Sequence, residues 1–237
     1  QICISAIEAL RKAEAKGIPT IIVTGNVVNY AYATEVLIGC SGGLVAENGG
    51  IVFKEGENNN AVETLVERDF VNSAEAHLQE KLGEKFNQHA SHDNMYRLTE
   101  TVFYKTIDLS ELEDALKDFK YLDQLEIYDS GFALHITDKR VNKGTSLKYL
   151  CERNGINMEN VMAIGDSQND EDFLKQAGYK KESWNGVDMQ KANELLKEAG
   201  YKIAVGNAED KLKEISTYTC EKSFGDGVAE AIEKFAL

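Results

Sequence analysis

The amino-acid sequence predicts an α/β protein whose core is a doubly wound (Rossmann-like) parallel sheet, with a smaller α+β cap inserted into that core. Two observations predict this fold. Helices and apolar strands alternate at both ends of the chain, and a middle block that follows a polar linker has a different pattern. We therefore expect a core domain formed by residues 1–59 and 140–237 and a cap domain formed by residues 60–139.

The first segment alternates helix and strand. Residues 4–17 place apolar side chains at helical spacing, and Gly17 is expected to end the helix. The run IPTIIVTG is continuously apolar, which is typical of a parallel strand buried on both faces. A second helix is expected over 27–39, and GLVAENGGIVF predicts two short strands joined by an Asn-Gly turn. This order favours a doubly wound sheet.

The middle segment has another pattern. Its linker, EGENNNAVE, is polar, and helix-rich sequence follows as far as about His92. A run MYRLTETVFYK and a helix LSELEDALKDF come next, and then the strands QLEIYDSG and FALHITDK. These two strands alternate apolar and polar residues, which indicates a half-exposed antiparallel sheet. Residues 60–139 are therefore predicted to form the cap.

The α/β alternation returns after the cap and continues to the last residues. The expected elements are helices over 144–154 and 169–177, the strands VMAIGD and KIAVGN, and a last helix GVAEAIEKF.

A near repeat interrupts this final segment. LKQAGYK at 174–180 recurs as LKEAGYK at 196–202, but Asp170 of the first copy corresponds to Ala192 in the second. A repeat of two short helical units does not form a solenoid, which needs several copies. We interpret residues 181–202 as an extra helical segment inserted at the surface.

Composition excludes several classes of function. The net charge is −14, so we expect no nucleic-acid partner, because binding to a phosphate backbone needs a basic surface. No apolar run approaches the roughly 20 residues that a membrane span needs, and no signal peptide is visible, so no membrane partner is expected. The four cysteines form no CxxC pair, which favours free thiols in the cytoplasm over structural zinc.

The run VMAIGDSQNDEDFL places four carboxylates within seven residues, directly after a predicted buried strand. Asp166 lies at the carboxyl end of that strand, where doubly wound sheets bind ligands. Asp170 begins the next helix, so its side chain can turn back toward the same crevice. Two such carboxylates suit Mg²⁺, which keeps several waters and often shares a phosphate. For Glu171 and Asp172 we favour the alternative that they only complement the helix dipole.

Two further strand-to-helix junctions offer groups that bind phosphate. Thr24, Gly25 and Asn26 follow an apolar strand, and a hydroxyl group with exposed backbone N–H groups can hold a phosphate, although such residues also cap helices. Lys143 opens the helix after the cap, where its ammonium group could reach the same crevice, although a lone lysine is usually a solvated surface charge. Phosphoryl transfer needs such groups because charge spreads over the phosphoryl oxygens.

Thr-Gly, Lys and Gly-Asp-x-x-x-Asp, in this order and each beside a strand end, resemble the motifs of haloacid dehalogenase-like (HAD) phosphatases. More closely, the chain resembles the archaeal-type phosphoglycolate phosphatases, which have a C2-type α/β cap, here residues 60–139. The matching runs are VTGN, ENGGIVF, NKG, IGDSQND, AVGNA and GVAEAI. The resemblance implies that Thr24 binds the phosphoryl group and that Lys143 steadies it and the nucleophile. It also implies that Asp166 and Asp170 hold Mg²⁺ and that Asn169 supports this metal site.

The same resemblance implies a partner and a reaction. The cap would close over the site and select a small phosphorylated metabolite, with 2-phosphoglycolate as the expected substrate and glycolate and phosphate as the products. A homodimer is an open expectation. Three alternatives also stay open: a sugar-phosphate phosphatase, a non-catalytic phosphate- or metal-binding remnant, and a scaffold of the same fold. A receiver-type signalling domain is disfavoured because an inserted cap would serve no purpose there.

One family motif is absent from the 237 residues. HAD phosphatases have a strand ending in Asp-x-Asp-Gly-Thr, whose first Asp becomes phosphorylated and whose second Asp protonates the leaving group. No such run occurs in this sequence. We therefore expect the chain as given to be impaired in turnover.

Overall fold

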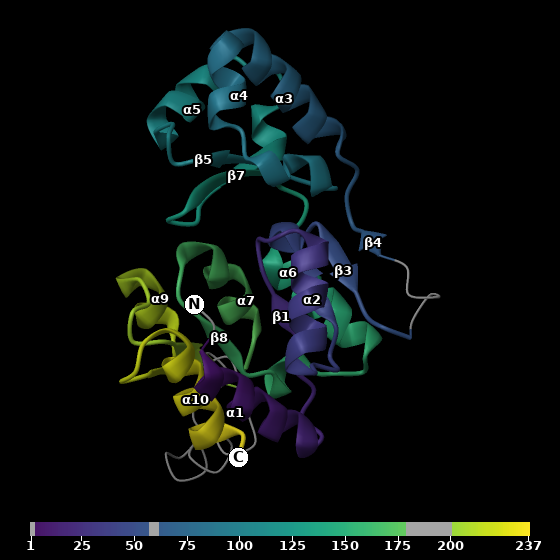
Figure 1. Cartoon of the computed structure of the whole chain (residues 1–237), viewed down its shortest axis with the longest axis vertical. Coiled ribbons are helices and arrows are strands. Elements are labelled where there is room, and N and C mark those ends of the chain that lie inside the picture. The colour runs from purple at the N-terminus through teal and green to yellow at the C-terminus, as the bar shows by residue number, and fades with distance from the viewer. Residues whose placement is uncertain (1–2, 57–61, 179–200) are drawn as a thin grey trace, which may run out of the picture.

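The computed structural model describes residues 3–56, 62–178 and 201–237. A larger α/β unit that contains both ends of the described chain lies below a smaller unit of helices and strands (Figure 1). Of the predicted extra segment 181–202, all but the last two residues lie outside the described ranges.

Helices and short strands alternate in the larger unit, as the sequence predicts. Its helices are α1 (Ile4–Ala15), α2 (Val28–Ile38), α6 (Lys143–Arg153), α7 (Glu171–Gln176), α9 (Asp210–Ile215) and α10 (Phe224–Phe235). Its strands are β1 (Ile22–Val23), β2 (Leu44–Ala46), β3 (Ile51–Phe53), β4 (Glu63–Thr64), β8 (Ala163–Gly165), β9 (Lys202–Ala204) and β10 (Tyr218–Thr219). Two 3-10 turns matter for the site, η1 (Glu47–Gly49) and η7 (Gln168–Asp170).

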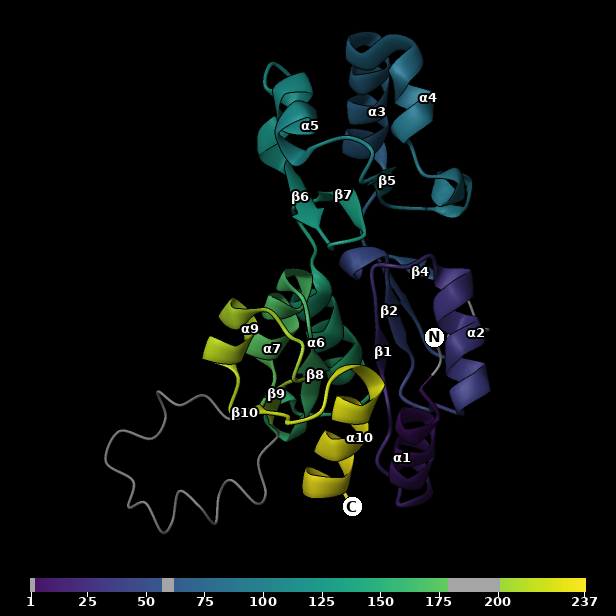
Figure 2. The same cartoon turned by 60° about the vertical axis from the view of Figure 1, so that its left-hand side comes forward.

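The core strands form two sheets. One has the order β1-β2-β3-β4, with β1 parallel to β2 and the other pairs antiparallel, and the other has the parallel order β10-β9-β8. Helices α6 and α7 pack on strands of both sheets (Figure 2). The buried apolar cluster that they share includes Val45, Val52, Leu147, Leu150, Ala163, Phe173, Leu174 and Ala204. The predicted α/β, Rossmann-like class is confirmed.

Strand β1 differs in one respect from the sequence prediction. Ile22 and Val23 are half-buried, whereas the apolar run IPTIIVTG predicts a strand buried on both faces. Among the described residues β1 pairs with β2 alone and β8 pairs with β9 alone, so each of them is an end strand of its sheet. A strand with one paired edge is less completely covered than a central strand.

The smaller unit has its own sheet and its own apolar core. Its helices are α3 (Asp69–Leu82), α4 (Phe86–His89) and α5 (Leu109–Leu116), and its strands are β5 (Thr101–Tyr104), β6 (Leu125–Asp129) and β7 (Ala133–Asp138). The strands form an antiparallel sheet in the order β5-β7-β6. The buried cluster between this sheet and the helices includes Leu78, Phe103, Leu112, Leu116, Leu134 and Ile136.

Strand β7 is more buried than its alternating sequence predicts. Leu134 and Ile136 face the helices of the smaller unit, and His135 and Thr137, on the other face, are buried as well. The prediction of a half-exposed strand is therefore wrong for β7. The α/β core covers this second face, where the His135 side chain contacts Asn48 of the core.

The two units join near residues 63–64. Strand β4 pairs with β3, with Ile51 opposite Thr64, so Glu63 and Thr64 extend a core sheet although the predicted domain division places them in the cap. Leu65 also belongs to the core, because its N–H donates to the Gly50 carbonyl at 2.8 Å and its side chain packs on the core cluster. We propose a boundary just after Leu65.

Candidate active site

The acidic residues after β8 form a compact loop that Asp170 closes. One carboxylate oxygen of Asp170, Oδ2, accepts hydrogen bonds from the backbone N–H groups of Asp166 and Ser167, at 3.0 and 3.3 Å. Gly165 permits this close return, because a Cβ atom at residue 165 would lie 2.7 Å from Cβ of Asp170. Asp166 and Asp170 therefore lie at the same strand end, as predicted from their spacing.

Lys143 provides the positive charge beside these carboxylates. Its Nζ donates to Oδ1 of Asp170 at 2.6 Å, and the two side chains are only 6% and 10% exposed. The position of Lys143 follows from the start of α6, where Asn142 caps the helix and accepts a hydrogen bond from the N–H of Thr145. The alternative of a solvated surface lysine does not fit this burial.

With a second carboxylate, Asp166, the site carries more negative than positive charge. Although Asp166 is an exposed residue, partial desolvation raises its pKa, the charge of Asp170 raises it further, and Lys143 and a hydrogen bond from Asn207 oppose the shift. One lysine thus faces two carboxylates. Such a pair favours a further cation in the crevice.

Mg²⁺ fits this donor set. Within residues 3–56, 62–178 and 201–237, no group of three His, Cys, Asp or Glu side chains is gathered around one point. Mg²⁺ is commonly bound through one or two carboxylates, with waters and substrate phosphate oxygens as its other ligands. Two carboxylates with an uncompensated negative charge are therefore sufficient.

The loop of Thr24, Gly25 and Asn26 follows β1 and is fixed by its backbone. Thr24 N–H donates to the Val45 carbonyl at 2.9 Å, and the Thr24 carbonyl accepts from Asn48 N–H at 3.2 Å. Asn26 N–H donates to Oγ1 of Thr24 at 3.1 Å. In the described part of the chain, the N–H of Gly25 has no hydrogen-bond partner. It is therefore available to an incoming oxygen atom.

Asn48 connects the two loops. A Cβ atom at residue 25 would lie 2.9 Å from the side-chain amide of Asn48, so Gly25 packs directly on it. Oδ1 of Asn48 in turn accepts a hydrogen bond from Nδ2 of Asn169 at 3.3 Å. The predicted residues of the phosphate loop and of the acidic loop therefore contact one and the same side chain.

Sequence reasoning missed Asn48, because the Asn-Gly pair in ENGGIVF was interpreted only as a turn. The backbone conformation, which the sequence does not show, marks this turn: Glu47 and Asn48 have φ values of 49° and 52°. Non-glycine residues rarely adopt this left-handed conformation, and it is concentrated at functional sites.

Cap residues hold this turn in place. The buried carboxylate of Glu47 accepts hydrogen bonds from the backbone N–H groups of Leu98 and Thr99 and from the Thr99 hydroxyl group. Asn48 donates from Nδ2 to Glu100 Oε2 at 2.8 Å and contacts Nδ1 of His135 at 3.1 Å. Burial and the charge of Glu100 raise the pKa of Glu47, and the Thr99 hydrogen bonds oppose this shift.

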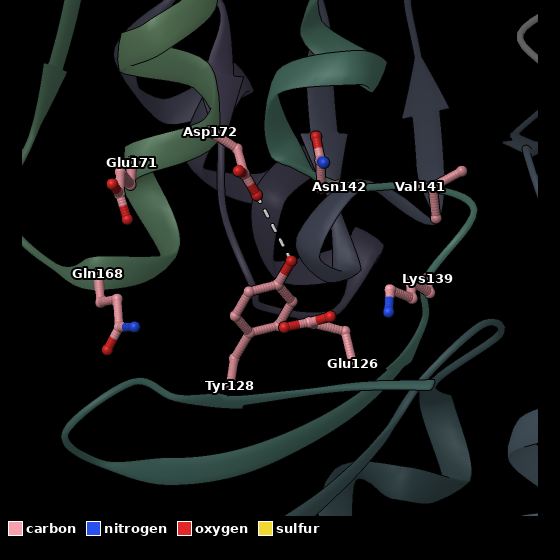
Figure 3. A pocket seen from close by; sticks show the side chains of 8 residues that line it. All are labelled: Glu126, Tyr128, Lys139, Val141, Asn142, Gln168, Glu171 and Asp172. Carbon is pink, nitrogen blue, oxygen red and sulfur yellow. Dashed lines mark hydrogen bonds between the residues drawn. The ribbon is translucent and has the colours of Figure 1, made fainter. Parts of the chain in front are cut away.

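A cavity of about 340 Å³ lies beside the acidic loop, between the cap sheet and the core. In Figure 3 the Tyr128 side chain extends from the cap toward Asp172 of α7, and its hydroxyl group lies 3.4 Å from Oδ2 of Asp172. The residues that line the cavity are Glu126, Tyr128, Lys139, Val141, Asn142, Gln168, Glu171 and Asp172. Both units therefore bound the cavity. Its lining residues Asn142 and Glu171 are the sequence neighbours of Lys143 and Asp170.

A family model described as haloacid dehalogenase-like hydrolase matches residues 72–194 and 186–232. The chain belongs to this family. It is 62% identical over 237 residues to a phosphoglycolate phosphatase of Methanobrevibacter smithii, covering 100% of the chain and 92% of that protein. It is 38% identical over 235 residues to a phosphoglycolate phosphatase of Methanothermobacter thermautotrophicus, covering 99% and 91%. The predicted family and enzyme class, a phosphatase of the HAD superfamily, are confirmed.

Solved structures support the fold. The crystal structure of Thermoplasma acidophilum 0175 matches with a TM-score of 0.75 and 23% identity, covering 99% of this chain and 90% of that one. BT4131, described as a HAD subclass IIB sugar phosphatase, matches with a TM-score of 0.69 and 20% identity, covering 99% and 92%. Within the described residues, no helix has the length and apolar character that crossing a membrane requires.

Proposed function

We propose that the chain forms the phosphate- and metal-binding part of a Mg²⁺-dependent phosphatase that hydrolyses a small phosphomonoester, 2-phosphoglycolate, to glycolate and phosphate. The names of the relatives from Methanobrevibacter smithii and Methanothermobacter thermautotrophicus support the substrate. The observation that carries the proposal is the 2.6 Å contact of Lys143 with Asp170 beside Asp166. This cation and these carboxylates are joined through Asn169 and Asn48 to the loop of Thr24.

Each side chain has a defined task in this proposal. The Thr24 hydroxyl group and the free N–H of Gly25 donate hydrogen bonds to phosphoryl oxygens, and the neighbouring Asn26 extends this donor loop. Lys143 neutralises part of the phosphoryl charge while it holds Asp170. Asp166 and Asp170 would hold Mg²⁺, with Asn169 as support, and the ion when bound would supply positive charge for the phosphoryl oxygens.

The attacking carboxylate is the part that these 237 residues do not supply, because they contain no Asp-x-Asp-Gly-Thr run. Strands β1 and β8 each have one edge without a strand partner among the described residues, so a strand bearing that motif would find edges to pair with. Its first Asp would attack phosphorus and form an aspartyl-phosphate as the bond from phosphorus to the glycolate oxygen breaks. The second Asp would protonate that oxygen, and water would then hydrolyse the aspartyl-phosphate.

The test measures phosphate release from 2-phosphoglycolate by three proteins: the chain as given, the chain extended by a strand ending in Asp-x-Asp-Gly-Thr, and the same extension with Asn in place of the first Asp. We expect Mg²⁺-dependent release from the Asp extension alone. Robust release by the chain as given would contradict the nucleophile assignment. Release from sugar phosphates in place of 2-phosphoglycolate would favour the sugar-phosphate alternative.

A calorimetric titration separates the non-catalytic alternatives. Binding of Mg²⁺ and inorganic phosphate without turnover in any of the three proteins would support a ligand-binding remnant, and the absence of both binding and turnover would support a scaffold.

We further propose a cytoplasmic location, which the four free cysteine thiols support. The expected homodimer stays a prediction.

A further inference from the structure

Arg97 of the cap contacts the phosphate loop of the core directly. Its Nη1 donates to the carbonyl oxygen of Gly25 at 2.9 Å. The Arg97 side chain is only 3% exposed, although it lies 72 residues away from Gly25 in the sequence. Through this hydrogen bond, a cap side chain holds the proposed phosphate-binding loop.

Two carboxylates fix the Arg97 guanidinium group in this position. Its Nη2 donates to Oδ2 of Asp93 at 2.8 Å, and its Nη1 also forms an ion pair with buried Glu100. Bidentate or doubly paired guanidinium groups are held in one orientation because their donors have a fixed planar geometry. The backbone around Arg97 is itself anchored, since Leu98 N–H and Thr99 N–H donate to Glu47.

The Gly25 carbonyl and the Asn26 N–H belong to one peptide group. In a trans peptide these two dipoles point in opposite directions and rotate together, and the described chain contains no cis peptide bond. Arg97 therefore fixes the carbonyl on one side and, through the same rigid plane, the Asn26 N–H on the other. That N–H donates to Oγ1 of Thr24 at 3.1 Å.

A hydroxyl group has one proton and can accept hydrogen bonds through its oxygen lone pairs. Because Oγ1 of Thr24 accepts from Asn26 N–H, its own proton points away from that N–H group and can be donated to another acceptor. A hydrogen bond to a cationic guanidinium group also polarises the Gly25–Asn26 peptide, which makes Asn26 N–H a better donor. Both effects favour the Thr24 hydroxyl group as a donor to a phosphoryl oxygen.

We propose that Arg97 is a positioning residue of the phosphate site: it sets the Gly25–Asn26 peptide plane and thereby directs the Thr24 hydroxyl proton to the phosphoryl group. This inference rests on the proposed function for the identity of the ligand. It makes the phosphate site complete only when the cap lies on the core, since Arg97 belongs to the cap and the loop belongs to the core.

The experiment titrates inorganic phosphate, in the presence of Mg²⁺, into the chain and its variants. Arg97→Lys keeps the charge but cannot reach Asp93, Glu100 and Gly25 together, and we expect about tenfold weaker phosphate binding, the loss typical of one oriented hydrogen bond. Arg140→Lys is the matched control: Arg140 lies just after the last cap strand, pairs with the cap carboxylates Asp138 and Asp69, and within the described chain makes no hydrogen bond to the phosphate loop. We expect less than about a twofold effect for this control.

A double-variant cycle distinguishes positioning from general support of the cap. If Arg97 acts through Thr24, the effect of Arg97→Lys on phosphate affinity disappears when Thr24 is replaced by valine, which keeps the shape but lacks the hydroxyl group. Equal losses in the Thr24 and Thr24→Val backgrounds would overturn the proposal.

Hydrogen exchange at the Asn26 amide gives a second readout that needs no ligand. We expect at least about tenfold faster exchange in Arg97→Lys and unchanged exchange in Arg140→Lys, because without Arg97 the Gly25–Asn26 peptide no longer holds its N–H group against Oγ1 of Thr24. Unchanged exchange in Arg97→Lys would overturn the proposal. If the unaltered chain fails to bind phosphate, the proposed function is wrong, and the Asn26 amide still decides whether Arg97 positions this peptide.

Discussion

The two loops that meet at the site are held in place in different ways. The acidic loop from Gly165 to Asp170 closes on itself, since Asp170 accepts hydrogen bonds from Asp166 and Ser167. Its longer-range partners include Lys143, Asn48 and Asn207, which belong to the core. The loop of residues 24–26 takes its partners from remote segments, including Glu47, Asn48 and Arg97. The proposed metal side is thus a property of the core, whereas the proposed phosphate side depends on the docked cap.

The largest effect is expected from breaking the acidic loop with Asp170→Ala. This change leaves the Lys143 ammonium buried without its partner, which typically lowers the free energy of unfolding by about 3–5 kcal/mol. Mg²⁺ affinity should disappear in calorimetry. The double variant Asp170→Ala with Lys143→Met is the control, because it removes the unpaired charge. Urea unfolding should show that it regains part of the stability, and no recovery would contradict the pairing argument.

Glu35 is a buried carboxylate outside both loops, and it sharpens the comparison because no cation among the described residues pairs with it. Burial raises the pKa of Glu35 to about 7, and Glu55 and Glu14 add to the shift while a backbone hydrogen bond from Gly43 opposes it. Glu35 is 5% exposed, and its Oε2 atom has no hydrogen-bond partner within the described chain.

The sign of this effect follows from the raised pKa. Below pH 4.5 the carboxyl group is protonated in both states and costs nothing; between pH 4.5 and 7 the unfolded state ionises first, so stability falls as the pH rises. We expect Glu35→Gln to stabilise the chain by about 3 kcal/mol at pH 8 and by about 1 kcal/mol at pH 5, from 1.36 kcal/mol per pKa unit. Urea unfolding at the two pH values measures the difference, and an equal gain at both would refute it.

Two glycine substitutions test the loops separately. Gly165→Ala places a Cβ atom 2.7 Å from Cβ of Asp170, and Gly25→Ala places one 2.9 Å from the Asn48 amide. We expect each to cost about 2 kcal/mol of stability through overpacking. Gly165→Ala should weaken Mg²⁺ binding more than phosphate binding, and Gly25→Ala should do the reverse. The two calorimetric titrations decide, and parallel losses of both ligands would show that the loops are not independent.

The smallest effect is expected at the docked cap. Thr99→Val removes the hydroxyl hydrogen bond to Glu47 but keeps the side-chain shape, at a cost of about 1 kcal/mol. Phosphate affinity should fall a few-fold, with Mg²⁺ affinity unchanged, because only the 24–26 loop depends on this junction. Thr137→Val, at a buried cap threonine with a long 3.4 Å hydrogen bond, is the control. A loss of Mg²⁺ affinity in Thr99→Val would contradict the comparison.

The sequence predicted the site residues that lie next to strand ends. Asp166 and Asp170 are four residues apart, and local backbone geometry brings such residues together wherever a strand turns into a helix. The position of Lys143 at the start of a helix was predictable for the same reason. Its burial and its contact with Asp170 were not, because these depend on how α6 packs against α7.

The contributions of the cap were beyond sequence reasoning. Arg97 and Glu100 lie in the run MYRLTETVFYK, whose sequence pattern gave no prediction of a site residue. Their contacts with Gly25 and Asn48 cross 72 and 52 residues of sequence. Charge and periodicity indicate which face of a helix or strand is apolar. They do not predict which polar residue of another unit will contact that helix or strand.

By itself, the sequence determined the α/β class and the order of the three motifs, because apolar spacing and turn residues act over a few neighbouring positions. The tertiary structure alone decided that Lys143 pairs with Asp170, that Asn48 joins the two loops in a left-handed backbone, and that Arg97 holds the Gly25 carbonyl. The physical reason is that desolvation and hydrogen bonding act between groups in contact, and folding chooses those contacts among segments that are far apart in the chain.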